Sequence, residues 1–249
     1  MPENQLNKVA AITFAFWVMK ICATTLGETA GDLLSMTLNI GYAASSLILI
    51  AVFLATLVGQ LTAKSYHPLL YWSVILSTST AGTTMSDYID RSLGMGYVAG
   101  SAMLLTLLLV ILAVWRANVG TLSVANVKSL KVESFYWAAI LVSNTLGTAL
   151  GDFLADSSGL GFAGGALLIA SLIALIVLAY FYTSVSRTAL FWIAFVLTRP
   201  LGATVGDLLT KPLEKGGFGF GTVGSSAVLL AVLIVSIVIV SRRKKPAAA

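Results

Sequence analysis

The chain has 249 residues, of which 58% are hydrophobic and 10% are charged, and its formal net charge is +5. About a quarter of the residues in a soluble globular domain are charged, so this composition excludes that class and indicates an integral membrane protein. The excess cations lie between apolar segments, and no basic face with interleaved aromatic residues occurs, so the charge argues against nucleic-acid binding. A single cysteine, Cys22, excludes an internal disulfide.

Eight apolar stretches are long enough to cross a bilayer, which takes about 20 residues each. In chain order they cover roughly residues 8–30, 40–62, 68–87, 95–116, 134–152, 160–183, 187–208 and 219–241. We therefore expect an all-α membrane protein with eight transmembrane helices in one domain, 1–249. The residues before the first stretch resemble no cleavable leader, so we expect that stretch to be retained.

The charged residues between these stretches separate into two sets if the helices alternate in direction. One set is basic and includes Lys8, Lys64, Arg116, Lys128, Lys131, Arg187, Arg242, Arg243, Lys244 and Lys245. The other collects most of the acids, with three cations: Asp32, Asp87, Asp90, Asp152, Asp156, Asp207, Glu214, Arg91, Lys211 and Lys215. The positive-inside rule then predicts that both termini are cytoplasmic and that the carboxylates lie toward the outer half of the membrane. We expect Asp90, Asp156 and Glu214 to be solvated beyond the helix ends.

One motif occurs four times along the chain. Its first copy, "TLGETAGDLL", is followed by "TAGTTMSDYI", "TLGTALGDFL" and "PLGATVGDLL". Every copy has a tryptophan ten residues before its first glycine and an aspartate five residues after it. The tryptophans are Trp17, Trp72, Trp137 and Trp192, the glycines are Gly27, Gly82, Gly147 and Gly202, and the aspartates are Asp32, Asp87, Asp152 and Asp207.

Each copy spans two helices, so successive copies have the same orientation in the membrane. Four parallel repeats, at about 8–62, 63–117, 128–183 and 184–241, predict pseudo-symmetry about the membrane normal, with the four aspartates at one depth. The four tryptophans and this organisation resemble a bacterial membrane-protein family built from four tandem two-helix repeats of unknown function. The resemblance covers nearly the whole chain and implies a multi-pass protein of the bacterial inner membrane, but no activity.

Oxygen-bearing side chains recur at positions i, i+3, i+4 and i+7 of the motif, which share one helix face. The candidates are Thr25, Glu28, Thr29 and Asp32 in the first repeat, Thr83, Thr84 and Asp87 in the second, Thr148 and Asp152 in the third, and Asp207 in the fourth. Carboxylates and hydroxyls without cysteine or histidine are the ligands of hard divalent cations. We expect Glu28 and the four aspartates to be the metal ligands, with the cation as cargo and no bound cofactor.

Structural roles compete with this interpretation. The spacing Gly-x-x-x-Gly lets membrane helices approach closely, and an aspartate after a glycine can cap a helical turn. The tryptophans fall near the expected middle of their helices, where they would fill contacts between repeats, with cargo stacking as the alternative. Glu28 is harder to explain structurally, because no other repeat has an acid at its position.

Two cations within the apolar stretches support a functional site. Lys20 lies mid-helix and needs a carboxylate partner or a lowered pKa, which suits a proton-coupled carrier. Arg199 stands where the other repeats have Thr24, Ser79 and Asn144, as a fixed charge in place of oxygen ligands, with an ion pair to a loop acid as the structural alternative. Pro200 is expected to kink the seventh helix.

These features lead us to expect a secondary transporter of a small cation, Mn²⁺- or Mg²⁺-like, with proton coupling as a driving force. The partners are then the lipid bilayer and the small cation, and oligomers are allowed. The alternatives are a channel with an aspartate ring, a carrier of an organic cation or zwitterion, and a non-transporting scaffold. No hydrolase or metalloprotease motif occurs, so an enzyme is not expected.

Overall fold

The computed structural model describes residues 8–124, 127 and 129–243, and within these ranges the regular structure is helical, without strands. Lys128, Lys244 and Lys245 of the expected basic set lie outside the described residues. The eight long helices agree closely with the expected stretches, except that the first begins later than residue 8. They are α1 (Phe14–Asp32), α2 (Tyr42–Thr62), α3 (Pro68–Asp87), α4 (Gly96–Val119), α5 (Leu130–Asp152), α6 (Gly161–Tyr182), α7 (Arg187–Thr210) and α8 (Thr222–Arg243).

Local sequence signals explain where the odd-numbered helices begin. The hydroxyl of Thr13 accepts a hydrogen bond from the backbone N–H of Phe16, which fixes the start of α1. Ser129 and Ser186 cap α5 and α7 in the same way, and α3 begins with Pro68, whose missing N–H costs nothing at this position. The α7 helix then continues through Pro200 to Thr210.

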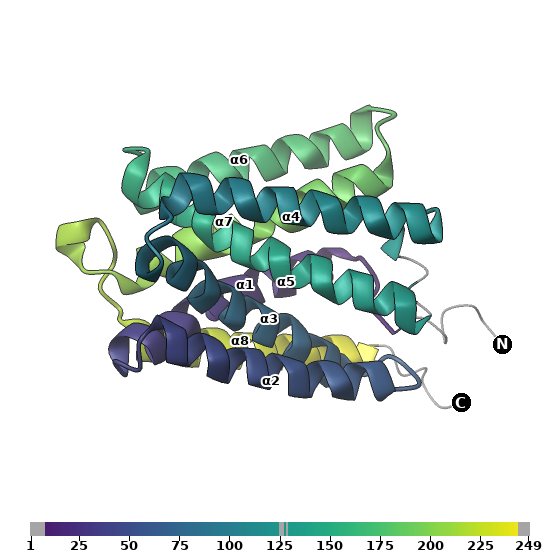
Figure 1. The fold of residues 1–249 in the computed structure, drawn as a ribbon, viewed down its shortest axis with the longest axis horizontal. Helices are drawn as coiled ribbons and strands as arrows, with labels where there is room; N and C mark the ends of the chain where they lie inside the picture. The colour runs from purple at the N-terminus through teal and green to yellow at the C-terminus, as the bar shows by residue number, and fades with distance from the viewer. Residues whose placement is uncertain (1–7, 125–126, 128, 244–249) are drawn as a thin grey trace.

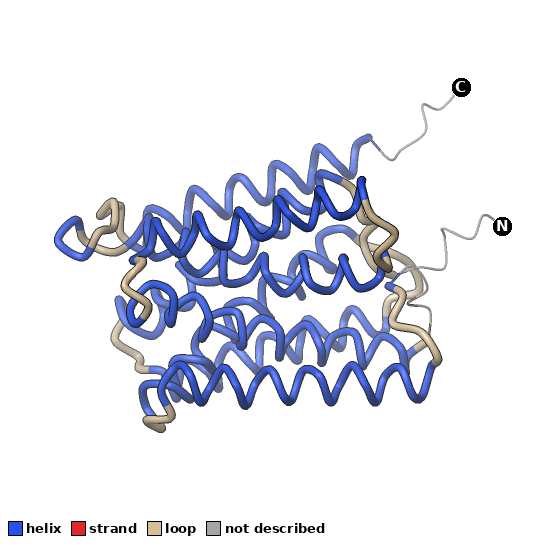
Figure 2. The backbone as a smooth tube through the Cα atoms, turned by 90° about the horizontal axis from the view of Figure 1, so that it is seen from above, coloured by secondary structure: helices blue, strands red, loops and turns tan. Residues whose placement is uncertain are grey.

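The odd-numbered helices form an inner ring in which α1 contacts α3, α3 contacts α5, α5 contacts α7, and α7 returns to α1. Each even-numbered helix covers this ring from outside by packing on an odd helix of the neighbouring repeat: α2 on α3, α4 on α5, α6 on α7, and α8 on α1 (Figures 1 and 2). The expected parallel arrangement of repeats around a common axis is therefore present.

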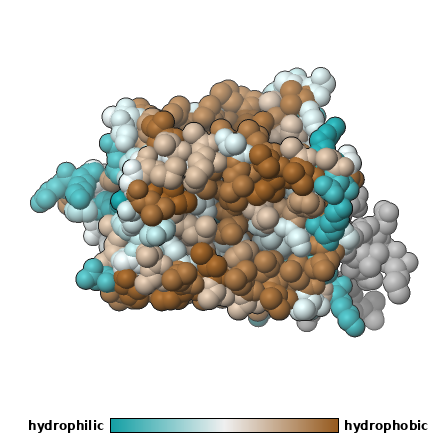
Figure 3. Space-filling view, in the orientation of Figure 1, coloured by the Kyte–Doolittle hydropathy of each residue, from teal (hydrophilic) through white to brown (hydrophobic). Residues whose placement is uncertain are grey.

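Six of the eight helices are long and apolar enough to cross a membrane: α2, α4, α5, α6, α7 and α8. The outer helices expose apolar side chains, among them Leu47 on α2 and Leu167 on α6, and hydrophobic surface spans the middle of the molecule between hydrophilic ends (Figure 3). These features are compatible with a multi-pass membrane protein. The helices α1 and α3 fall outside the six because they are less apolar: α1 contains Lys20 and Glu28, and α3 is rich in serine and threonine from Ser77 to Thr84.

The ring closes through small residues, as Gly-x-x-x-Gly predicts. A Cβ on Gly82 would lie 2.9 Å from the backbone nitrogen of Thr145, and one on Gly202 would lie 2.7 Å from the backbone carbonyl carbon of Thr24. Every first glycine of the motif meets the same position of the next repeat, and the fourth meets the first. The facing pairs are Gly27 and Ser79, Gly82 and Asn144, Gly147 and Arg199, and Gly202 and Thr24.

The first three motif aspartates end their α-helices, and each helix continues as one π-helical turn: Leu33–Thr37, Tyr88–Ser92 and Phe153–Ser157. Asp32, Asp87 and Asp152 make no side-chain capping hydrogen bond to these turns, so capping does not explain them. The fourth repeat has a loop here, with one 3₁₀ turn at Leu213–Lys215. No pattern in the sequence predicts the π-helical turns.

The repeat tryptophans lie within about the first two turns of the odd helices, so placing them near the middle was wrong. Their predicted role in contacts between repeats is confirmed. The ring of Trp72 lies 5.8 Å from that of Phe16, and the ring of Trp17 lies 5.7 Å from that of Phe191. An aromatic residue precedes each repeat tryptophan and extends this cluster. These residues are Phe16, Tyr71, Tyr136 and Phe191.

Candidate functional site

Arg199 occupies the centre of the inner ring and contacts all three other odd helices. Its Nη2 donates to Glu28 Oε2 on α1 at 2.9 Å, to Thr83 Oγ1 on α3 at 2.5 Å and to Thr148 Oγ1 on α5 at 2.7 Å. The guanidinium is fully buried, and the Glu28 side chain is 3% exposed. The alternative of an ion pair between Arg199 and a loop acid is therefore wrong, because its partner is a core carboxylate.

The three acceptors occupy equivalent positions in repeats one to three, where the fourth repeat has Ala203. The small Ala203 side chain leaves space beside these three acceptors. The long side chain of Arg199, which lies one turn earlier on α7, fills that space at the centre of the inner ring. This agrees with the expectation that a fixed positive charge replaces oxygen ligands in the fourth repeat. The Arg199 Nε has no hydrogen-bond partner within the described part of the chain.

Lys20 is fully buried about two turns from Glu28, but among the described residues it makes no ion pair. Its Nζ donates to Asn144 Oδ1 at 3.3 Å and lies 4.2 Å from the centre of the Phe195 ring. The Asn144 amide in turn donates to Thr78 Oγ1 at 2.9 Å. Of the two alternatives expected for Lys20, the carboxylate partner is therefore wrong, because an amide and an aromatic face contact the ammonium instead.

The four motif aspartates are buried and form two pairs, each bridged by a cation. Lys211 Nζ lies 2.6 Å from Asp32 Oδ2 and 3.1 Å from Asp207 Oδ1, which joins repeats one and four. Arg91 lies 3.0 Å from both Asp87 Oδ1 and Asp152 Oδ2, which joins repeats two and three. The acidic end therefore has pseudo-twofold symmetry, and the aspartates do not form one uniform ring.

Sequence reasoning missed the roles of these bridging cations and treated Arg91 and Lys211 as loop charges. The signal was their spacing, because each stands four residues after a motif aspartate. The first and third repeats have Met36 and Asp156 at that position. A residue four places further along a helix lies on the same side, so these cations reach their own aspartate and that of a neighbouring repeat.

The prediction that Asp90 is solvated was wrong, because its residue is 5% exposed. The π-helical turn after α3 brings its carboxylate against Gly100 of α4, and the Ser86 hydroxyl donates to Asp90 Oδ2 at 3.2 Å. Asp156 and Glu214 are exposed, as expected.

At the other end, Glu133 is a buried acid that sequence reasoning overlooked; it pairs with Lys8 at 2.9 Å.

The threonine stripe divides between the centre and the helix backbone. Thr83 and Thr148 bind Arg199, whereas Thr25 donates to the carbonyl of Ile21 and Thr84 to that of Ala81. Thr29 meets the Ser226 hydroxyl of α8 at 2.8 Å. Thr25, Thr29 and Thr84 make no hydrogen bond to Arg199 among the described residues, so their place in a cation site stays a prediction.

Three carboxylates lie close enough together to hold one metal ion. Glu28, Asp32 and Asp207 each offer an oxygen, and these oxygens lie within 4.8 Å of one another. Asp87 and Asp152 are not part of this group, so the five expected metal ligands divide into this set and the Arg91-bridged pair. Glu28 is also held by Arg199, and Asp32 and Asp207 are also held by Lys211.

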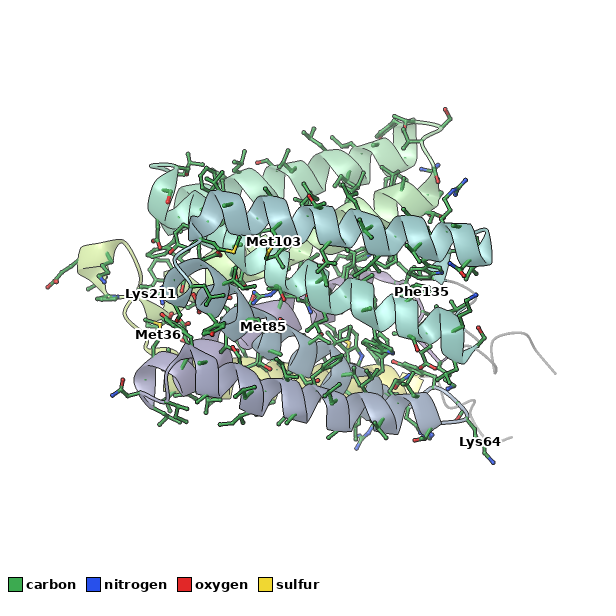
Figure 4. The ribbon with its side chains drawn as sticks, viewed as in Figure 1. Met36, Lys64, Met85, Met103, Phe135 and Lys211 are labelled. Atoms are coloured by element: carbon green, nitrogen blue, oxygen red, sulfur yellow. The ribbon has the colours of Figure 1, made fainter. Side chains whose placement is uncertain are left out.

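Lys211 lies just beyond the end of α7, and its side chain is 21% exposed. Burial alone would lower the pKa of this lysine, but the negative charges of Asp207 and Asp32 outweigh it and raise the pKa above its ordinary value. The side chain therefore remains a cation at neutral pH. It lies beside Met36 at the acidic end, opposite Lys64 (Figure 4).

The fold and its repeated motif can be compared with known protein families. The chain matches the model of a family described as Repeat of Unknown Function (DUF347) at residues 15–66, 70–121, 135–186 and 190–246. The chain belongs to the DUF347 family. Each DUF347 repeat contains one odd helix and the even helix after it, which confirms the four tandem repeats expected from the sequence. Searches of curated proteins and of solved structures gave no match.

Proposed function

We propose that this DUF347 protein is a secondary transporter of a small cation, and that Glu28, Asp32 and Asp207 bind the cargo. The observation that supports this most is the convergence of three buried carboxylates from repeats one and four within 4.8 Å. Ionisable groups inside a membrane domain are costly and commonly mark ion pathways. A second observation is that a cation, the Lys211 ammonium, already lies against two of these carboxylates.

The proposal includes eight membrane-spanning helices in a bacterial plasma membrane. The helices α1 and α3 would cross it as members of the inner ring, where α8 packs on α1 and α2 packs on α3. Lys64, Arg116, Lys131 and Arg187 lie in or beside the connections at the end where the described chain starts and finishes. The positive-inside rule assigns that basic end to the cytoplasm and the carboxylates to the outer half.

The bridged pairs favour a carrier over an aspartate-ring channel. A selectivity ring needs equivalent contributors around one axis, whereas here each pair is closed by its own cation, and Arg199 fills the centre. An organic cation held by tryptophans is also disfavoured, because Trp72 and Trp137 are at most 3% exposed and pack near the basic end, away from the carboxylates.

The test is uptake of Mn²⁺ into vesicles that contain the purified protein, with and without a proton gradient. We expect Glu28→Gln and Asp32→Asn each to abolish uptake, because each removes one charge of the binding site. Glu214→Gln and Asp156→Asn are matched controls, since both change exposed acids at the same end, and they should transport normally.

Folding of every variant is checked by size-exclusion chromatography and tryptophan fluorescence. Full uptake by the Glu28 and Asp32 variants would refute the site. No uptake of Mn²⁺, Mg²⁺ or Ca²⁺ by wild-type protein would instead support the non-transporting scaffold. Faster Mn²⁺ uptake in the presence of the proton gradient would identify proton coupling. Equal uptake with and without the gradient would exclude that coupling.

A further inference from the structure

The Lys211 ammonium lies where a bound cation would contact Asp32 and Asp207. We propose that the Lys211 ammonium occupies the cation position between Asp32 and Asp207 when no cargo is bound, and that a divalent cation displaces it on binding. This inference rests on the proposed function and specifies its substrate class as divalent. In this role Lys211 lowers the affinity of the carboxylates for the cargo cation and limits its access to them, although the lysine itself does not bind the cation.

The geometry allows the ammonium to leave without rearrangement of the ring. The side chains of Asp32 and Asp207 are 4% and 6% exposed, whereas that of Lys211 is 21% exposed, so the lysine approaches from the solvent side. Its backbone lies just after the last residue of α7, so the side chain can swing outward while the helix stays in place.

The segment after Lys211 is specific to the fourth repeat. The chain from the motif aspartate to the glycine before the next helix is three residues longer here than in the other repeats, and this segment contains "KPLEKGG", 211–217. The loop extends beyond the helix ends at the acidic end of the bundle (Figure 1). Backbone N–H groups of Phe218 and Phe220 donate to the carbonyls of Leu208 and Leu209, which anchors the returning chain to the end of α7. These bonds hold the backbone of Lys211 just beyond α7, where its ammonium contacts Asp32 and Asp207.

Charge balance favours a divalent cargo over a monovalent one. With all three carboxylates ionised, Glu28, Asp32 and Asp207 carry three negative charges, while Arg199 and Lys211 supply two positive charges. Replacing the ammonium by a monovalent ion leaves the same excess of one negative charge. Replacing it by a divalent ion neutralises the group, and neutrality is strongly favoured where water is excluded.

The pseudo-twofold counterpart of Lys211 provides an internal comparison. Arg91 binds Asp87 and Asp152 through two different nitrogens, and its guanidinium lies 5.7 Å from the centre of the Tyr97 ring. The third acid that Arg91 contacts is Asp156, at 3.9 Å, and its side chain is 46% exposed; the positions equivalent to Glu28 in these two repeats are threonines. An arginine that binds two carboxylates is harder to displace than one ammonium, so we infer that this half is a permanent clamp.

The first experiment uses wild-type protein and measures acetylation of lysines by mass spectrometry. Added Mn²⁺ should increase the labelling of Lys211 at least threefold, because the displaced amine enters solvent. Lys215 is already exposed and serves as the control, with unchanged labelling. Na⁺ at the same ionic strength should have no effect on either lysine, and Glu28→Gln should suppress the response of Lys211.

The second experiment measures Mn²⁺ binding by electron paramagnetic resonance for three variants. Lys211→Gln should lower the apparent Kd at least tenfold, because the internal competitor is gone, whereas Lys211→Arg should raise it. Arg91→Gln is the matched control and should leave the Kd within about twofold. Thermal unfolding of each variant identifies loss of binding that results from misfolding.

The outcomes separate the two proposals. Tight Mn²⁺ binding by wild-type protein with unchanged labelling of Lys211 overturns the role of Lys211 and leaves the transporter standing. Displacement of Lys211 by Mn²⁺ without any uptake into vesicles overturns the transporter and leaves the role of Lys211 standing. Failure of both wild-type protein and Lys211→Gln to bind Mn²⁺ overturns both.

Discussion

Replacing Arg199 by methionine should show how strongly the core depends on internal charge balance. The substitution removes a fully buried guanidinium and leaves Glu28, 3% exposed, without its ion-pair partner at 2.9 Å. Breaking a buried pair from one side typically costs about 3–5 kcal/mol, because the remaining charge is uncompensated. The hydroxyls of Thr83 and Thr148 lose the same partner, although Thr83 still donates to the carbonyl of Gly27.

A second substitution makes this prediction quantitative. Glu28→Gln alone should also cost about 3–5 kcal/mol, because it leaves the fully buried Arg199 guanidinium without its counter-charge, although the amide oxygen still accepts a hydrogen bond. The double variant, Glu28→Gln with Arg199→Met, should lose at least about 1 kcal/mol less free energy of unfolding than the sum of the two single losses, since no buried charge then remains uncompensated. The assay is reversible unfolding in mixed micelles, followed by tryptophan fluorescence. Strictly additive costs would refute the reasoning, because they would show that Glu28 is not held by Arg199.

Three further predictions concern packing and the basic end. Trp72→Phe should preserve transport at wild-type rates in the vesicle assay, because Trp72 fills contacts between repeats; loss of transport in a folded variant would make this side chain a cargo contact. Gly82→Ala should lower the free energy of unfolding by about 1–3 kcal/mol, since its Cβ would lie 2.9 Å from a backbone nitrogen, and an unchanged stability would contradict the close crossing. Glu133→Gln should destabilise the protein, because Lys8 then loses its ion pair in a half-buried position; the same midpoint as wild type would count against this contact.

The repeated motif was sufficient to predict the architecture. Eight apolar stretches and four equally placed tryptophans define four parallel two-helix units, and the Gly-x-x-x-Gly spacing predicts how the inner helices cross. These features depend on local composition and on close packing between equivalent positions, so one sequence contains them. The π-helical turns were not predictable in the same way, because each packs against even-numbered helices, and local sequence does not show such tertiary contacts.

The site was only partly predictable, because repeats that look equivalent in sequence are not equivalent in charge. Glu28 and the aspartates were identified as candidates, and the structure buries all five. Their partners depend on which repeats are adjacent in the closed ring, so the bridge from Lys211 to Asp32 connects the two ends of the chain. The contacts of Lys20 were not predictable, because its ammonium lies against Phe195 and Asn144. These residues belong to different helices, and nothing in the sequence indicates that both contact Lys20.

The most direct test of the account is an experimental structure of the protein with Mn²⁺, in which anomalous scattering identifies the metal. The account predicts a peak at about 2.2 Å from oxygens of Glu28, Asp32 and Asp207, a distance typical of metal–carboxylate bonds, with the Lys211 ammonium moved toward solvent. A structure in which Lys211 still bridges Asp32 and Asp207, and Mn²⁺ is found only at exposed acids such as Glu214, would contradict it.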